Sequence, residues 1–350
     1  MLQSGKILNA LGTLYESFGY MRFKMNKFEE YDTYVENKSF LTSDNVITFT
    51  DTNGKLMALK PDVTLSIVKN TKDEPGIAKK VYYSENVYRV AGDSGSFKEI
   101  MQSGLECIGD VGTYELSEVI GIARDSLAAL QDEFVLDVAH LGIVSAAMDE
   151  AGLSESAKIK MRALFSVKNV NGAEELLAEE GVSEKGKSLI LSLMKIGGAP
   201  ETAIPLLLSL SSDKNYLACV KELKEVLSVV GGKNVRVDFS VMNDMRYYNG
   251  VVFQGFVKGA ARCVLSGGQY DLLLKKMKRT SKAIGFAVYL DEIEETLDDA
   301  TDVDTLILFS EKNAAEEVAS AVRAERSKGK KVIAEKAIPP FLRYGELKKL

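Results

Sequence analysis

The spacing of apolar residues predicts a helix and then a β-hairpin near the start of the chain. Apolar residues recur at helical intervals over positions 7–18, and Gly19 follows where a helix would be capped. We therefore expect an amphipathic helix that ends at this glycine. Residues 46–60 then alternate around Asn53-Gly54. This dipeptide is a strong hairpin signal, because both turn positions of the tight hairpin need positive φ.

Further strands and a covering helix are expected before residue 143. Residues 81–90 and 101–110 have strand-like patterns and are joined by a polar loop, which indicates a longer hairpin. Residues 114–130 have the apolar spacing of a helix that lies on a sheet, and residues 134–142 are another strand candidate. Antiparallel strands covered by helices indicate an α+β fold.

The pattern changes between residues 144 and 229, where helical spacing dominates and strand signals are almost absent. Strand patterns return over 235–241, 247–257 and 260–268, so the second segment is expected to complete the sheet begun before the insertion. Strand, helix and strand patterns then follow an acidic linker. The predicted organisation is a core segment 1–143, a helical insertion 144–229, a second core segment 230–297 and a short α/β tail 303–350.

Composition and charge narrow the classes of protein to which the chain can belong. Its 350 residues are 46% hydrophobic and 27% charged, as in ordinary globular proteins. No apolar run is long enough for a membrane span, and the first residues lack a signal peptide's apolar core, so we expect a cytoplasmic protein. A net charge of −6 disfavours nucleic acid as a partner. The three isolated cysteines indicate reduced thiols, and neither a metal site nor a cofactor is expected.

Polar residues in the expected strands are candidates for a ligand pocket. Asp62 and Thr64 lie two residues apart, so on an extended strand both side chains would face one side and could hold a ligand's ammonium group. A turn after Pro61 with solvated polar groups explains the same pattern. Arg89 ends an aromatic-rich strand, where it is either an arginine at the sheet edge or a clamp for a carboxylate or phosphate.

Gln102, Gly104 and Glu106 alternate on one face of their expected strand, and Gly104 would leave room for a small molecule between the two polar groups. Alternation on a solvated face explains these residues equally well. Tyr247 and Tyr248 could wall a pocket, although paired tyrosines in a strand are more often part of a core.

Several glycines and the single histidine give weaker signals. Gly267 and Gly268 precede an expected helix but lack the full phosphate-binding fingerprint. His140 lies in an apolar strand, which favours a structural role over that of a general base. Gly285 indicates a small-residue turn before an apolar stretch that ends in two acidic residues.

The order of these segments is more specific than any one of them, and it runs GYMRFKMNKFEEYD, LKPDVT, VYRVAGDSGSFKEIMQSGLECIG, VLDVAHLG, YYNGVVF, SGGQYD and AIGFAVYLDEI. In sequence and spacing this series resembles the catalytic core of histidyl-tRNA synthetase and of its paralogues, the ATP phosphoribosyltransferase regulatory subunits. The resemblance covers roughly residues 5–296. It implies a class II aminoacyl-tRNA synthetase-like fold, in which helices flank an antiparallel sheet, with a helical insertion and a dimeric assembly.

The resemblance implies that the amino-acid side of the family's pocket is largely intact. Asp62 stands where the synthetase has a glutamate facing the ligand's amino group, and Tyr247 and Tyr248 match the tyrosine pair near the imidazole. The residues that the resemblance assigns to histidine binding are Asp62, Thr64, Arg89, Gln102, Glu106, Tyr247 and Tyr248.

The nucleotide side departs from the family's pattern. The family draws the phosphates of ATP into place with three arginines, of which Arg89 keeps the first, while Asn243 and Glu292 stand at the other two positions. Losing one such charge donor typically lowers the rate by about 10² to 10³. A carboxylate beside phosphate adds repulsion, so adenylation is predicted to be lost.

The resemblance therefore implies a non-catalytic regulatory subunit of ATP phosphoribosyltransferase. Such a subunit binds a short-form catalytic partner, is needed for its activity in the first step of histidine biosynthesis, and helps to pass on feedback inhibition by histidine. We expect a homodimer within a hetero-oligomer. Two alternatives stay open: a divergent histidyl-tRNA synthetase-like amino acid ligase, in which Arg246 or Lys98 replaces the lost cations, and a tRNA-binding module, which the acidic balance disfavours.

Overall fold

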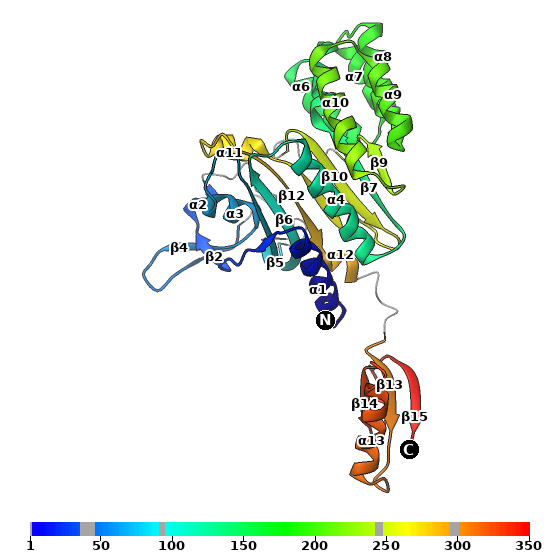
Figure 1. The fold of residues 1–350 in the computed structure, drawn as a ribbon. Coiled ribbons are helices and arrows are strands. Elements are labelled where there is room, and N and C mark those ends of the chain that lie inside the picture. The colour runs from blue at the N-terminus through cyan, green and yellow to red at the C-terminus, as the bar shows by residue number, and fades with distance from the viewer. Residues whose placement is uncertain (1, 36–45, 91–94, 242–247, 295–300) are drawn as a thin grey trace. The chain divides into compact units, whose positions relative to one another are not determined.

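The computed structural model describes residues 2–35, 46–90, 95–241, 248–294 and 301–350 (Figure 1). The chain divides into two compact units, Ser4–Ile293 and Glu294–Leu350, the second of which also takes in the first three residues. The larger unit contains the residues for which chemistry is expected.

A nine-stranded sheet is the centre of the larger unit. Most neighbouring strands pair antiparallel, but the pairs β1–β5 and β7–β9 are parallel, so the sheet is mixed. The strands lie in the order β1 (Met21–Arg22), β5 (Ala78–Val90), β6 (Phe97–Gly109), β12 (Lys282–Tyr289), β11 (Leu265–Gln269), β10 (Val251–Val257), β7 (Phe134–His140), β9 (Val235–Asp238) and β8 (Gly197–Gly198).

β10, β11 and β12, which follow the helices after β7 in sequence, lie between β6 and β7, which precede those helices. β12 pairs with β6, and β10 pairs with β7, both antiparallel. The expectation that the second segment completes the sheet is therefore confirmed, as is the α+β class. Residues that are about 180 apart in sequence become direct neighbours by this pairing, for example Gly285 and Glu106.

Helices α1 (Leu2–Ser17) and α4 (Thr113–Leu130) cover one face of the large sheet (Figure 1). Tyr15 of α1 is fully buried, and its ring centroid lies 5.7 Å from that of Tyr82 and 6.0 Å from that of Phe286. Phe286 alternates with Gly285 and Ala287 along β12, so these two smaller residues face the opposite side of the sheet. The first helix ends two residues before Gly19, whose φ is 79°, as the sequence predicts.

The predicted hairpin forms, but its turn differs from the expected one. β3 (Thr48–Thr50) pairs antiparallel with β4 (Leu56–Leu59), and β2 (Phe28–Glu30) adds to the other edge of β4. Gly54 has a φ of 81°, as expected, whereas Asn53 does not adopt positive φ, so the expectation was correct for Gly54 and wrong for Asn53. Asp51 stabilises the turn instead, because its carboxylate accepts hydrogen bonds from the backbone amides of Asn53 and Lys55, both at 2.8 Å.

Helices dominate the residues between β7 and β9, in agreement with the sequence pattern. Five of their N-termini are capped by side chains that accept a hydrogen bond from a backbone amide, namely those of His140, Ser154, Asn169, Ser183 and Asp213. None of the helices in the described part of the chain is long and apolar enough to span a membrane. The helices are α5 (Leu141–Glu150), α6 (Glu155–Ser166), α7 (Val170–Glu179), α8 (Glu184–Lys195), α9 (Pro200–Leu210) and α10 (Lys214–Val230). The division of this unit into core and insertion stays a prediction.

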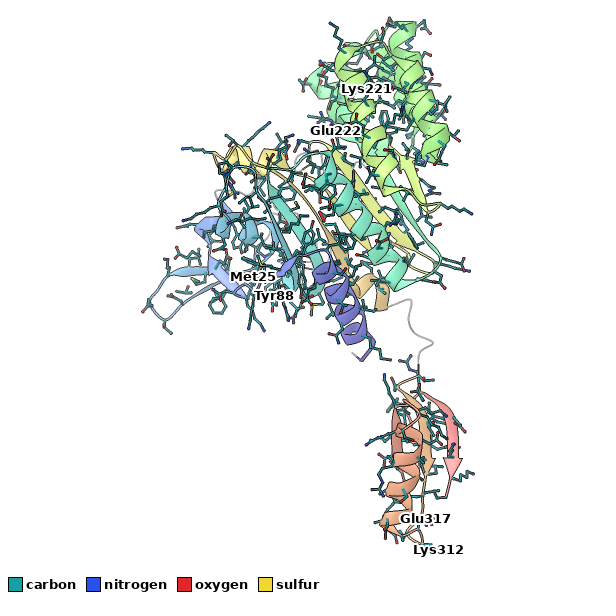
Figure 2. All side chains as sticks on the ribbon, in the orientation of Figure 1. Met25, Tyr88, Lys221, Glu222, Lys312 and Glu317 are labelled. Atoms are coloured by element: carbon teal, nitrogen blue, oxygen red, sulfur yellow. The ribbon has the colours of Figure 1, made fainter. Side chains whose placement is uncertain are left out.

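His140 links the sheet to these helices. Its Nδ1 accepts a hydrogen bond from the backbone amide of Gly142 at 3.0 Å, at the start of α5. Its Nε2 lies 3.0 Å from a carboxylate oxygen of Glu222 on α10, which is labelled in Figure 2. Because Nδ1 accepts, Nε2 carries the ring proton and donates it to Glu222. These contacts fit the structural role that the sequence favours.

Residues 303–350 form a small sheet with one helix. The strand, helix and strand that the pattern predicts are β13 (Val303–Leu308), α13 (Ala315–Arg326) and β14 (Val332–Glu335). β15 (Tyr344–Lys349), which the pattern does not predict, pairs parallel with β13. The carboxylate of Glu325 at the end of α13 forms salt bridges with Lys328, Lys330 and Lys348, so it links the helix to the following loop and to β15.

Candidate functional site

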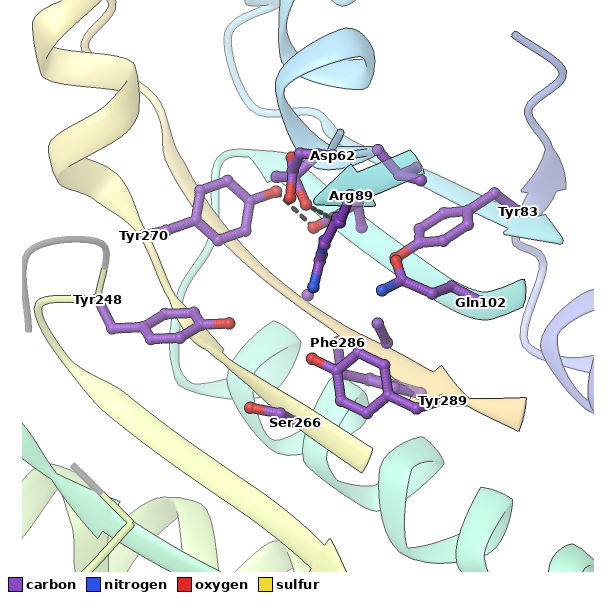
Figure 3. A pocket seen from close by; sticks show the side chains of 14 residues that line it. Asp62, Tyr83, Arg89, Gln102, Tyr248, Ser266, Tyr270, Phe286 and Tyr289 are labelled. Carbon is purple, nitrogen blue, oxygen red and sulfur yellow. Dashed lines mark hydrogen bonds between the residues drawn. The ribbon is translucent and has the colours of Figure 1, made fainter. Parts of the chain in front are cut away.

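A cavity of about 70 Å³ lies beside the face of the large sheet that carries Gly285 and Ala287 (Figure 3). Pockets for drug-sized molecules have roughly 300–1,000 Å³, so this cavity suits a small polar ligand. The described residues contain no cluster of histidine, cysteine and acidic side chains that could hold a metal ion. Six of the seven sequence-predicted binding residues line the cavity, namely Asp62, Thr64, Arg89, Gln102, Glu106 and Tyr248.

Gly285 makes the space in which the Glu106 carboxylate lies. The two residues are directly paired across β12 and β6. A Cβ atom on Gly285 would lie 1.8 Å from Oε2 of Glu106 and 2.6 Å from the backbone oxygen of Leu105. The glycine is therefore required by close packing inside a strand, and the expectation of a turn at Gly285 was wrong.

Gly104 has a packing role of the same kind. A Cβ atom at this position would lie 2.1 Å from the backbone oxygen of Phe286 and 2.7 Å from the hydroxyl of Tyr83. Protein atoms thus fill the room that the sequence interpretation reserved for a ligand, and that expectation was wrong. Gly268 lies in β11, where its Cβ would meet Tyr248 at 2.8 Å, so the paired glycines serve strand packing and do not precede a phosphate-binding helix directly.

Glu106 is the most strongly perturbed acid in the cavity. It is 2% exposed, and its carboxylate accepts hydrogen bonds from Thr64 Oγ1 at 2.6 Å and from the Tyr270 hydroxyl at 2.5 Å. Burial raises the pKa of Glu106 to about 8; the two hydrogen bonds oppose this shift, and nearby Asp62 adds to it. A carboxylate offers about four acceptor positions, so two are left for N–H groups of a ligand.

Asp62 and Thr64 do not lie on a strand, so the geometric premise for pairing them was wrong. Asp62 lies between bends at Pro61 and Val63, and Thr64 begins helix α3 (Thr64–Asn70). The carboxylate of Asp62 accepts a hydrogen bond from the backbone amide of Leu65 at 3.0 Å. Both side chains nevertheless line the cavity. Burial raises the pKa of Asp62, while the Leu65 amide and the charge of Arg89 lower it.

Arg89 provides the cation of the site. Its Nε donates to the backbone oxygen of Pro61 at 3.2 Å, which places the guanidinium near Asp62. Figure 3 shows the side chain running into the cavity between Gln102 and the tyrosines Tyr248 and Tyr289. The cavity therefore combines acidic groups with a guanidinium, the pairing that an amino-acid zwitterion needs.

Glu292 does not line the cavity. It lies in the short helix α12 (Leu290–Glu294), and its Oε1 is 3.6 Å from Nη1 of the exposed Arg262. Tyr247 and Asn243 lie outside the described residues. The effect of Asn243 and Glu292 on nucleotide binding stays a prediction.

Sequence interpretation missed several residues that line the cavity. Tyr83 is paired with Gly104 across β5 and β6, and Tyr270 follows β11 at the start of α11 (Asp271–Lys276). Ser266 and Tyr289 come from β11 and β12. The period of two through Gly285, Ala287 and Tyr289 is the signal that could have identified the last of these.

Comparisons with known proteins agree on one family. Residues 2–293 match the protein family described as Histidyl-tRNA synthetase. An ATP phosphoribosyltransferase regulatory subunit of Bacillus pumilus is 30% identical over 340 residues, which cover 94% of this chain and 86% of the relative. A histidine–tRNA ligase of Methanocaldococcus jannaschii is 26% identical over 296 residues, which cover 83% of this chain and 71% of the ligase. A crystal structure from Bacillus halodurans is described as an ATP phosphoribosyltransferase regulatory subunit/histidyl-tRNA synthetase. It superposes on this chain with a TM-score of 0.76 at 26% sequence identity, and the match covers 98% of this chain and 92% of the Bacillus halodurans chain.

Proposed function

The chain belongs to the histidyl-tRNA synthetase family, among its ATP phosphoribosyltransferase regulatory subunits, and we propose that it serves a short-form ATP phosphoribosyltransferase as a non-catalytic regulatory subunit. The observation that carries this proposal is the 30% identity to a regulatory subunit over 94% of the chain. The chain acts in the first step of histidine biosynthesis, in the cytoplasm, as a homodimer within a hetero-oligomer with the catalytic subunit.

The cavity supports histidine as the effector. Asp62 and Arg89 lie at one part of the cavity and suit the ammonium and carboxylate groups of an amino acid. Glu106 suits an N–H group of a side chain such as imidazole, because its carboxylate has acceptor positions to spare. A cavity of about 70 Å³ accommodates such a ligand more readily than a nucleotide.

Loss of adenylation rests on missing cations. Of the three arginines that the family uses for ATP, this chain keeps Arg89. Glu292 pairs with Arg262, which offsets part of the charge of Glu292. Repulsion between Glu292 and phosphate therefore contributes less to the loss of adenylation than the missing cation does. Without that preorganised charge, the α-phosphate of ATP lacks stabilisation when it is attacked.

Reconstitution with a catalytic subunit tests the proposal. The purified chain, mixed with a short-form ATP phosphoribosyltransferase from the same genome, should form a hetero-oligomer and raise the turnover of ATP with phosphoribosyl pyrophosphate. Added histidine should then inhibit the complex. Sedimentation and a continuous absorbance assay measure the two effects, with the catalytic subunit alone as the control. Absence of association at micromolar concentrations would overturn the proposal.

A divergent amino acid ligase is the second candidate, since the chain is 26% identical to a histidine–tRNA ligase and keeps Arg89. Histidine-dependent exchange of pyrophosphate into ATP distinguishes the two functions. A regulatory subunit gives no exchange above the background without histidine, whereas a ligase gives exchange that saturates with histidine.

Asp62→Asn is expected to weaken histidine binding by about tenfold or more, because the variant removes the charge that faces the ammonium group. Isothermal calorimetry of the isolated chain measures the change. Asp51→Asn is the matched control, since Asp51 lies in the β3–β4 turn, away from the cavity. Equal affinities for wild type and Asp62→Asn would place the effector site elsewhere in the complex.

A further inference from the structure

Tyr289 and Ser266 lie at the end of the cavity to which Arg89 points. The cavity face of β12 reads Gly285, Ala287 and Tyr289, so two small residues are followed by one large ring. Four residues of strand span about 13 Å, so Tyr289 stands well away from the Glu106 carboxylate that lies against Gly285.

The two ends of the cavity differ in charge. Asp62, Thr64, Glu106 and Tyr270 gather at one end. At the other end, Tyr289 is paired with Gln102 across β12 and β6, and Ser266 is paired with Ala287 across β11 and β12. In Figure 3 the Arg89 side chain extends from beside Asp62 toward Tyr289 and Ser266, while Tyr270 lies beside Asp62. Arg89 therefore reaches from the acids to the end that carries the two hydroxyl groups.

This combination of groups matches a carboxylate. Burial raises the pKa of Tyr289, and Arg89 and Ser266 oppose the shift without cancelling it, so the phenol keeps its proton at neutral pH and can donate it. A guanidinium occupies two of the acceptor positions of a carboxylate, and hydroxyl donors can take the others.

We infer that Tyr289 and Ser266, together with Arg89, bind the carboxylate of the amino-acid ligand, and that the Tyr289 ring closes the cavity behind it. The inference rests on the proposed histidine-sensing function and deepens it. It makes the free carboxylate a requirement, because a group attached to that carbon would collide with the ring of Tyr289. Selection for a free amino acid over its esters and adenylate thus comes from the shape of the cavity as well as from missing cations.

Comparing histidine with histamine, which lacks the carboxylate, tests the role of the hydroxyl groups. Wild type should bind histidine more tightly than histamine. Tyr289→Phe and Ser266→Ala should each weaken histidine binding by about five- to tenfold while leaving histamine within about twofold. Tyr88→Phe is the matched control, because the Tyr88 hydroxyl donates to Glu99 outside the cavity. This control should preserve the affinities of both ligands.

Histidine methyl ester tests the closing role of the ring. Wild type should bind the ester much more weakly than histidine. In Tyr289→Ala, the ratio of the affinity for histidine to the affinity for the ester should fall by about tenfold. Equal losses for histidine and histamine in Tyr289→Phe, or an unchanged ester gap in Tyr289→Ala, would overturn the inference, as would a wild type that binds no histidine. None of these outcomes bears on activation of the catalytic subunit, so the proposed function is judged separately.

Discussion

Glu106 is expected to contribute a loss of about 3 kcal/mol of stability between about pH 5.5 and pH 8.5 in the ligand-free protein, and Glu106→Gln should remove that contribution. Burial raises the pKa of Glu106 from 4.5 in the unfolded chain to about 8 in the folded protein. The folded state therefore binds this proton more tightly than the unfolded state. Its contribution to stability is fully present below about pH 4.5 and disappears as the pH rises through 8.

The surroundings of Glu106 act in the same direction. Burial also raises the pKa of Asp62, so ionising both acids in one cavity is unfavourable, and the charge of Arg89 offsets only part of this. Tyr83 and Tyr270 stand close by as neutral phenols: burial raises the pKa of Tyr83 far above the range of the experiment, and Tyr270 donates its hydroxyl to Glu106. Urea denaturation at a series of pH values gives the free energy of unfolding.

Two variants show whether Glu106 is the source of the pH dependence of stability. Glu106→Gln has no proton to lose in this range, so its stability should vary much less with pH. Glu99→Gln is the matched control, because Glu99 lies on the same strand but is exposed, and this variant should keep the slope of the wild type. If Glu106→Gln keeps the wild-type slope as well, the buried acid is not the source of the effect.

Histidine should reduce the same pH dependence. An N–H donor or cation that contacts Glu106 favours the ionised carboxylate and lowers its pKa. Binding below pH 8 then releases a proton, which calorimetry in buffers of different ionisation enthalpy detects. The acid that destabilises the empty cavity thereby becomes the group that selects the ligand.

Periodicity along the chain predicted most elements of this fold, because each of those signals is local. The first helix, the 46–60 hairpin and the alternation of Gln102 and Glu106 on β6 all depend on neighbours within a few residues. Thr64 was misplaced because the short helix α3 follows a proline and is too brief to show a helical period. β15 was missed because its polar sequence lacks the apolar pattern of a buried strand.

The candidate site depends on long-range pairing, which periodicity does not encode. Glu106 and Gly285 meet only because β12 pairs with β6, although the helices α5 to α10 separate the two strands in sequence. The resemblance to a known family identified six of the fourteen lining residues, but it treated Glu292 by its motif position alone. In the structure the chain turns into α12 after Tyr289, so Glu292 pairs with Arg262 and the tyrosine lines the cavity. A change in backbone direction of this kind decides which neighbour of a motif reaches the ligand.

Gly285→Ala is expected to destabilise the protein by about 2 to 3 kcal/mol and to abolish measurable histidine binding. The added Cβ would lie 1.8 Å from the Glu106 carboxylate and 2.6 Å from the backbone oxygen of Leu105. The carboxylate can swing away, but only by leaving Thr64 and Tyr270, its two hydrogen-bond donors. The backbone oxygen belongs to the neighbouring strand and cannot move without disturbing the sheet. Thermal unfolding and calorimetry measure the two losses.

Gly121→Ala is the matched control for this substitution. Gly121 lies inside helix α4, where an added Cβ meets no atom within 4 Å, so alanine should be neutral or stabilising by up to about 1 kcal/mol. Adding Glu106→Ala to Gly285→Ala separates the two clashes. If the double variant is more stable than Gly285→Ala, the recovered stability measures the clash with the Glu106 carboxylate. The loss that remains measures the clash with the backbone oxygen of Leu105. If Gly285→Ala alone keeps wild-type stability and histidine affinity, Glu106 does not occupy the space beside this glycine, and the acidic end of the cavity is not the one that recognises the ligand.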